Sequence, residues 1–147
     1  MSDAQRASDE LEIASLLTRY ARGVDTKDWE LYRSVFTEDA AIDYTQSGGI
    51  EGTFAEVKPW LAENLPIFPK RMHSLGQVEV RHRDVAPDEV HVADVAAYFH
   101  NPMMLATGDG NETLVELGGI YHHEMVRTAA GWRSRRLVEE LVWKRGL

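Results

Sequence analysis

The stretch that decides the fold class is SDELEIASLLTRYARGVD, residues 8–25. Its apolar side chains recur at helical spacing and form one stripe, made of Ile13, Leu16, Leu17, Tyr20 and Val24. Ser8 is a residue type that caps helices, and Asp9 follows in the first turn, where the helix dipole favours acids. We therefore predict a helix from Ser8 to Val24 or Asp25, preceded by a flexible tail over residues 1–7.

Working outward from this helix, the chain places its helices first and its strands last. The residues predict a second helix over 28–36, a short strand over 40–44 and a third helix from the capping box at Thr53 to Asn64, with Pro59 able to kink or divide it. Segments rich in valine and aromatic residues predict strands over 77–83, 89–101, 114–128 and 132–144. Helices packed on one face of a curved antiparallel or mixed sheet make an α+β fold.

Composition narrows the classes of function. The 147 residues fit one domain over 1–147, and the formal net charge of −8 argues against binding nucleic acid or an anionic membrane surface. The chain has no cysteine, so disulfides, thiolate chemistry and cysteine-ligated metals are excluded. The N-terminus lacks the features of a signal peptide and no apolar run approaches the ~20 residues of a membrane span, so we expect a cytoplasmic protein.

This order of segments resembles the SnoaL-like branch of the nuclear-transport-factor-2-like superfamily. The resemblance is carried by IASLLTRYA at 13–21, Asp25, WELYRSVFTEDA at 29–40, RMH at 71–73, GIY at 119–121, EMVR at 124–127, GW at 131–132 and Arg136. Members include scytalone dehydratase, bile-acid 7-alpha-dehydratase and hexachlorocyclohexane dehydrochlorinase. The resemblance implies that the sheet curls into a cone, that three N-terminal helices close it, and that the interior holds a small hydrophobic organic ligand.

The same resemblance implies a pair of catalytic residues. The dehydratases and the dehydrochlorinase share an aspartate after the first helix and a histidine that opens a strand about fifty residues later; Asp25 and His73 stand in those places, 48 residues apart. Tyr20 corresponds to a tyrosine that some of these dehydratases carry before the aspartate. A neutral imidazole suits general-base work near neutral pH, and a carboxylate on its other nitrogen fixes the tautomer.

One feature of the strand after His73 argues against this reading. Simple alternation groups His73 with Leu75, Gln77, Glu79 and Arg81, which is a polar face. A β-bulge near Gly76 switches the phase, and without one His73 points away from the interior.

Four further residues are candidates for contact with a substrate. Tyr44 and Tyr98 are polar aromatic residues near or within predicted strands. The resemblance implies that Asn101 is an amide deep in the cone and that Arg136 is an inward-facing arginine, although Arg133 and Arg135 beside it equally suit a solvated face.

The sequence leaves three classes of function open. The first is a cofactor-free, metal-free lyase with His73 as base, Asp25 as its partner and Tyr20 as an auxiliary donor. The second is a non-catalytic domain that binds a small molecule or a protein. The third is an isomerase or polyketide cyclase that uses an acidic base such as Asp94. In each case we expect a homo-oligomer, a dimer or trimer formed through the outer face of the sheet.

Overall fold

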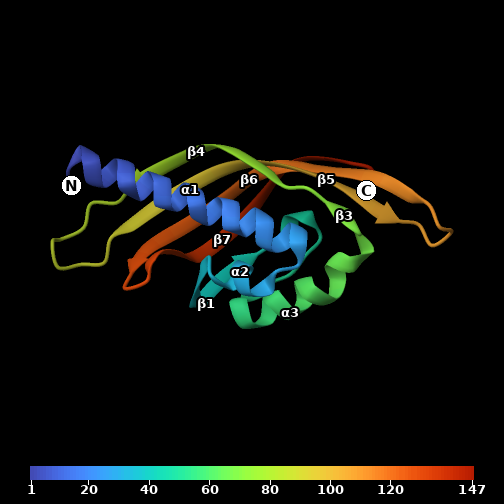
Figure 1. Cartoon of the computed structure of the whole chain (residues 1–147), viewed down its shortest axis with the longest axis horizontal. Coiled ribbons are helices and arrows are strands. Elements are labelled where there is room, and N and C mark those ends of the chain that lie inside the picture. Colours follow the sequence, from blue (N-terminus) through green and yellow to red (C-terminus); the bar gives the residue numbers. More distant parts are fainter.

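The computed structural model describes residues 1–147 and shows a long curved sheet with helices packed against its concave face (Figure 1). The helices are α1 (Asp3–Thr26), α2 (Trp29–Arg33) and α3 (Phe54–Asn64), with 3-10 turns η1 (Thr45–Ser47) and η2 (Leu65–Ile67). The strands are β1 (Phe36–Asp43), β2 (Glu51–Thr53), β3 (Lys70–Arg71), β4 (Ser74–His82), β5 (Val92–Ala106), β6 (Glu112–Thr128) and β7 (Gly131–Arg145). The predicted α+β class is confirmed.

The seven strands form one sheet in the order β2-β1-β7-β6-β5-β3, with β4 also paired to β5. All pairs are antiparallel except β1 with β7, which are parallel. The pairing with β7 explains one difference from the sequence-based prediction. Phe36, expected at the end of a helix, opens β1 opposite Ser134, and the Ser134 N–H donates to the Val35 carbonyl at 2.8 Å.

Helix α1 begins earlier than its apolar stripe predicts. Ser2, rather than Ser8, is the N-cap and accepts a hydrogen bond from the Gln5 N–H, so the tail expected over residues 1–7 is helical from Asp3. The helix ends at Thr26 and is capped by Lys27, which has a left-handed backbone (φ 57°) and whose N–H donates to the carbonyls of Gly23 and Val24. Helix α3 carries the predicted capping box at Thr53 and Glu56 and continues without division through Pro59.

A β-bulge in β4 decides which way His73 faces. Gly76 pairs with Tyr98 and Val78 with Ala97, so Gln77 is an extra residue, and it adopts a left-handed backbone with φ 50°. The inserted residue switches the alternation of the strand. His73 and Leu75 before the bulge therefore share the concave face with Val78 after it, as the sequence required for an inward-facing histidine.

Two hydrophobic cores lie between the helices and the concave face of the sheet. The larger core lies where the C-terminal part of α1, together with α2 and α3, packs on the sheet. It includes Tyr20, Tyr32, Tyr44, Phe99 and Tyr121. The smaller core lies under the middle of α1, which contributes Ile13, Leu16 and Leu17, and it includes Trp132. No helix of the structure has the length and apolar character needed to cross a bilayer.

We expect the bulge to make position 77 sensitive to side-chain branching. Left-handed backbone costs an L-residue about 1–2 kcal/mol, and a β-branched side chain tolerates it worst. Gln77→Val should therefore lower the free energy of unfolding by about 1 kcal/mol, whereas Gln77→Gly should preserve or raise it. The measurement is urea denaturation, with Glu79→Val, an exposed position on the same strand, as control. Equal stability of Gln77→Val and wild type would contradict the predicted strain.

Candidate functional site

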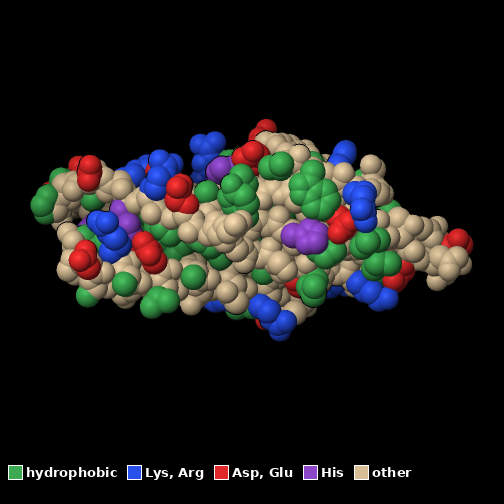
Figure 2. Space-filling model, turned by 90° about the horizontal axis from the view of Figure 1, so that it is seen from above, with side chains coloured by type: hydrophobic (Ala, Val, Ile, Leu, Met, Phe, Trp, Pro, Cys, Tyr) green, Lys and Arg blue, Asp and Glu red, His purple; other side chains and the backbone are tan.

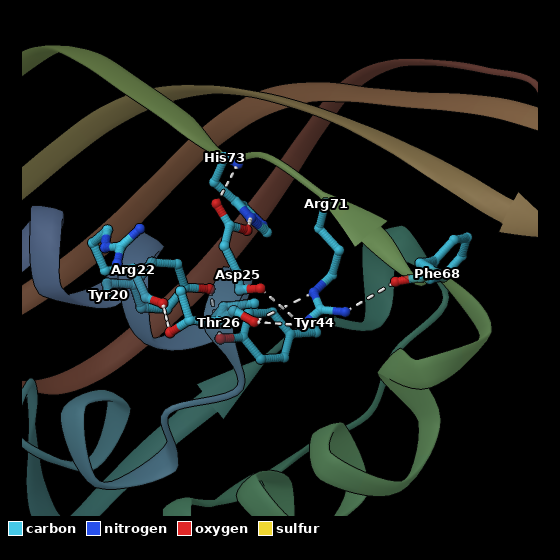
Figure 3. A network of polar contacts seen from close by, with 9 residues as sticks. Tyr20, Arg22, Asp25, Thr26, Tyr44, Phe68, Arg71 and His73 are labelled. Atoms are coloured by element: carbon cyan, nitrogen blue, oxygen red, sulfur yellow. Dashed lines mark hydrogen bonds and ion pairs between the residues drawn. The ribbon is translucent and has the colours of Figure 1, made fainter.

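Asp25 holds His73 at two points. One carboxylate oxygen, Oδ1, lies 2.6 Å from the ring nitrogen Nδ1, and the other, Oδ2, accepts the backbone N–H of His73 at 2.8 Å (Figure 3). The His73 side chain is 5% exposed and that of Asp25 17% exposed. With Nδ1–H donating to the carboxylate, the neutral ring keeps its lone pair on Nε2.

Arg71 supports this arrangement from the strand just before His73. Its guanidinium reaches the end of α1, where it donates to the carbonyls of Val24 at 2.9 Å and Asp25 at 3.2 Å, and it also donates to the Phe68 carbonyl at 2.9 Å (Figure 3). A cation at a helix C-terminus is favourable, and here it offsets the unfavourable placement of the Asp25 carboxylate in the last turn. Burial lowers the pKa of Arg71, while the charge of Asp25 opposes that shift.

The His73 ring lies in the wall of a cavity of about 360 Å³. Most of the lining is apolar, from α1, α3, η2 and the concave face of the sheet, and includes Val24, Trp60, Leu61, Phe68, Met103 and Leu117. The edge-to-face contact of His73 with Tyr20, at 6.5 Å between ring centroids, fixes the plane of the imidazole. Polar side chains that line this largely apolar space include those of Tyr20, Tyr44, His73, Asn101 and Tyr121, together with Ser47 and Asn64 at its margin.

Asn101 lies beside His73 across the sheet. Arg71 pairs with Met103 and Ser74 with His100, so the same register sets His73 opposite Asn101. Directly opposite residues have Cβ atoms about 4.5–5.5 Å apart. Asn101 is buried, and its Oδ1 atom has no hydrogen-bond partner. Because buried polar atoms are normally paired, this amide has hydrogen-bonding capacity left for a molecule in the cavity.

Three tyrosine hydroxyls meet at the other side of the cavity. The Tyr44 hydroxyl lies 2.7 Å from that of Tyr20 and 2.9 Å from that of Tyr32. Three hydroxyl protons serve two contacts, so one proton remains to donate elsewhere. Burial raises the pKa of each of these tyrosines well above 10, which keeps them protonated and available as donors.

Residues 5–138 match the model of the SnoaL-like domain. The chain belongs to this family. The uncharacterised protein Rv2910c of Mycobacterium tuberculosis is 39% identical over 140 residues, which are 95% of this chain and 89% of that protein. The crystal structure of Kfla4162 from Kribbella flavida superposes with a TM-score of 0.80 at 26% identity, covering 96% of this chain and 95% of that one.

A type 2 hexachlorocyclohexane dehydrochlorinase (LinA) has the same fold. Its crystal structure superposes with a TM-score of 0.79 at 20% identity and covers 99% of this chain and 93% of that one. At this identity the likeness concerns the fold alone. The shared fold agrees with the α+β architecture predicted from the order of segments in the sequence, and the family rests on the match to the SnoaL-like domain over residues 5–138.

Two predicted pocket residues lie on the outer face of this SnoaL-like sheet instead. Tyr98 is 52% exposed, because it alternates with Ala97 and Phe99, which both face inward. Arg136 is exposed because a register shift near Glu124 leaves both Arg135 and Arg136 on the outer side. The two corrections therefore have different causes, which are simple alternation in β5 for Tyr98 and a register shift between β6 and β7 for Arg136. Figure 2 shows this outer face, where charged, histidine and hydrophobic side chains are mixed.

The acidic base considered for an isomerase also lies outside the cavity. Asp94 accepts two hydrogen bonds from Arg83, at 2.7 and 2.9 Å, and these bonds lower the pKa of its carboxyl group. A carboxylate held by a surface arginine is neither directed at the cavity nor poised to accept a proton near neutral pH. The structure therefore removes Asp94 as the base.

Two buried titratable residues behind the cavity wall, His123 and Glu139, were not predicted from the sequence. The Ser134 hydroxyl donates to the Arg136 carbonyl and so must accept from Nδ1 of His123, at 2.8 Å, which leaves Nε2 without a proton and without a partner. Burial lowers the pKa of His123 to about 3. A signal for Glu139 was present, because it alternates with Leu137 and Leu141 in β7.

We expect the hydroxyl of Tyr44 to stabilise the fold more than that of Tyr32. Tyr44→Phe leaves the buried Tyr20 and Tyr32 hydroxyls without their shared partner, and each unsatisfied group costs about 1–3 kcal/mol. Tyr32→Phe keeps the Tyr20–Tyr44 bond and should cost about 1 kcal/mol. The free energies of unfolding of the two variants, measured by chemical denaturation, test this order. A smaller loss for Tyr44→Phe would show that the hydroxyls find other partners.

Buried His123 makes the protein less stable in acid. The pKa of His123 is about 3 in the folded protein and 6.5 in the unfolded chain. Between pH 3 and pH 6.5 the unfolded chain therefore binds up to one more proton than the folded protein. The free energy of unfolding should therefore fall with decreasing pH by up to about 1.4 kcal/mol per unit through this range. Denaturation at a series of pH values should give a shallower slope for His123→Gln than for wild type. The exposed neighbour variant His122→Gln is the control, and equal slopes for both variants would contradict the assignment.

Proposed function

We propose that this SnoaL-like protein is a cofactor-free lyase. In this proposal it removes a carbon-bound proton from a hydrophobic cyclic or polyketide-like molecule, next to an electron-withdrawing group or a leaving group. The observation that carries the proposal is the contact of 2.6 Å between Asp25 and His73 at the wall of an apolar cavity. A separation above ~6 Å would instead have favoured a binding module, since general-base pairs need hydrogen-bond reach.

His73 is the proposed general base. Asp25 fixes Nδ1–H, which leaves Nε2 as the only ring atom able to accept a proton. The second carboxylate bond, to the backbone N–H of His73, prevents the aspartate from rotating away from the ring. When the imidazole becomes charged, the adjacent carboxylate stabilises it. General-base catalysis of this kind contributes about 10²–10⁴-fold to rate.

Asn101 and the tyrosines are the proposed ligand-orienting groups. The Asn101 amide lies across the strand pair from His73, so an oxygen of the substrate bound to it would place the neighbouring carbon near the base. Tyr20 and Tyr44 contribute hydroxyl groups from the opposite side of the same cavity. Donors on one side and a base on the other suit a molecule that loses a proton and a leaving group from adjacent atoms.

Hydrogen–deuterium exchange provides a test that needs no knowledge of the natural substrate. Cyclic ketones, hydroxylated tetralones and polychlorinated cyclohexanes are incubated with the protein in deuterated buffer, and deuterium uptake or elimination is followed by NMR. His73→Ala and Asp25→Asn should each slow the reaction by about 10²–10⁴-fold. Tyr98→Phe, a change on the outer face, should leave the rate unchanged.

Two outcomes would oppose the proposal. Full activity of His73→Ala would remove His73 as the base. Binding of panel members in the cavity without any exchange or elimination by the wild type would favour the non-catalytic binding domain.

A further inference from the structure

Glu139 is a buried acid without a cationic partner. It lies on the concave side of β7, is 5% exposed, and forms no ion pair with any lysine, arginine or histidine. Its Oε1 atom has no hydrogen-bond partner. The other buried acid, Asp9, is paired with Arg127. An ionised carboxylate at the Glu139 position would lack compensation, since burying an unpaired charge is costly.

The groups around Glu139 are neutral except for one acid. They are Tyr20 from α1, Tyr32 from α2, Asp43 from β1, Tyr44 at the N-cap of η1, Ser47 from η1 and Tyr121 from β6. Burial, reinforced by the charge of Asp43, raises the pKa of Glu139 to about 7, although the nearby hydroxyl groups of Ser47 and Tyr121 oppose the shift. The carboxyl group therefore holds a proton through much of the range below pH 7.

Tyr121 connects this carboxyl group to the cavity. It is the cross-strand partner of Glu139, its hydroxyl is near enough to the carboxyl group to lower the pKa of Glu139, and it lines the same cavity as His73. The Tyr121 ring is stacked on Phe99 at 4.2 Å between centroids, so its position is fixed. Burial also raises the pKa of Tyr121 well above 10, which makes a lasting phenolate at this position unfavourable. A proton given up by Tyr121 must therefore be replaced at once.

We propose that Glu139 is a positioning residue that supplies a proton, through the Tyr121 hydroxyl, to an oxygen leaving group in the cavity. The inference rests on the proposed lyase function and narrows its substrate class to molecules that lose water. A halide departs as a stable anion, whereas a hydroxyl group must be protonated as its bond to carbon breaks. A protonated carboxyl group behind the cavity wall therefore assists the loss of a hydroxyl group but not the loss of a halide.

The carbon-bound proton moves to Nε2 of His73, and the electrons of that bond form the carbon–carbon double bond. The carbon–oxygen bond breaks, the departing oxygen takes the phenol proton of Tyr121, and Tyr121 takes the carboxyl proton of Glu139. One substrate gives one unsaturated product and one water. Return of the proton from the His73 imidazolium to the Glu139 carboxylate through water restores the starting state.

Paired substrates test this assignment. A β-hydroxy and a β-chloro cyclic ketone with the same ring are compared in the wild type, Glu139→Gln, and the control Glu140→Gln, which alters an adjacent acid that pairs with His122 on the outer face. Glu139→Gln should slow loss of water by 10-fold or more, on the order of general-acid effects, and change loss of chloride less than about twofold. Tyr121→Phe should show the same selectivity, and Glu140→Gln should affect neither reaction.

Infrared spectroscopy tests the proton on Glu139 without requiring turnover. The difference spectrum of wild type minus Glu139→Gln should contain the carbonyl stretch of a protonated carboxyl group, which disappears as the pH rises through about 7. If Glu139→Gln does not fold, the same band is sought in the wild type labelled with ¹³C-glutamate.

The outcomes separate this inference from the lyase proposal. Equal slowing of water and chloride loss by Glu139→Gln would assign Glu139 a structural role and leave His73 as the base. Absence of the titrating carboxyl band would show that Glu139 is not protonated and would overturn its role as the proton source for Tyr121. Full activity of His73→Ala would overturn the dyad, whatever the infrared result.

Discussion

The contact between Asp25 and His73 joins the end of α1 to the beginning of β4, and the geometry of the cavity depends on it. Asp25 uses one oxygen for the ring and the other for the backbone of the same residue, while Arg71 secures the helix end from the adjacent strand. A helix C-terminus alone disfavours a carboxylate. The surrounding donors make the placement stable, and they also hold His73 in one orientation toward the cavity.

The cavity combines an apolar lining with a small number of incompletely paired polar groups. Apolar burial stabilises the fold, but Asn101 and Glu139 each retain a buried oxygen without a partner. Such atoms cost stability wherever they occur, so each one in a native protein calls for an explanation. Their positions differ in kind: Asn101 lines the cavity beside His73, whereas Glu139 lies behind Tyr121. The first suits contact with a ligand and the second suits control of a hydroxyl donor.

Much of the fold could be predicted because hydrophobic periodicity is local. The stripe of α1, the capping box of α3 and the long valine-rich strands each follow from residues close together in the chain. The ends of helices and strands were harder to predict where they depend on pairing with a segment distant in the sequence. Phe36 is a strand residue because β7 pairs with it. Arg136 faces outward because a register shift between β6 and β7 resets the strand phase, and Tyr98 faces outward because it alternates with inward-facing Ala97 and Phe99.

The sequence by itself determined the class of fold, the family resemblance and the candidate pair of Asp25 and His73, because these rest on residue order and spacing. Only the tertiary structure decided which side chains meet. It placed Gln77 in a bulge that turns His73 inward, set Asn101 opposite His73, and enclosed Glu139 among tyrosines from distant parts of the chain. The physical reason is that burial, hydrogen-bond pairing and strand register are properties of contacts between distant segments, and a linear pattern specifies them only indirectly.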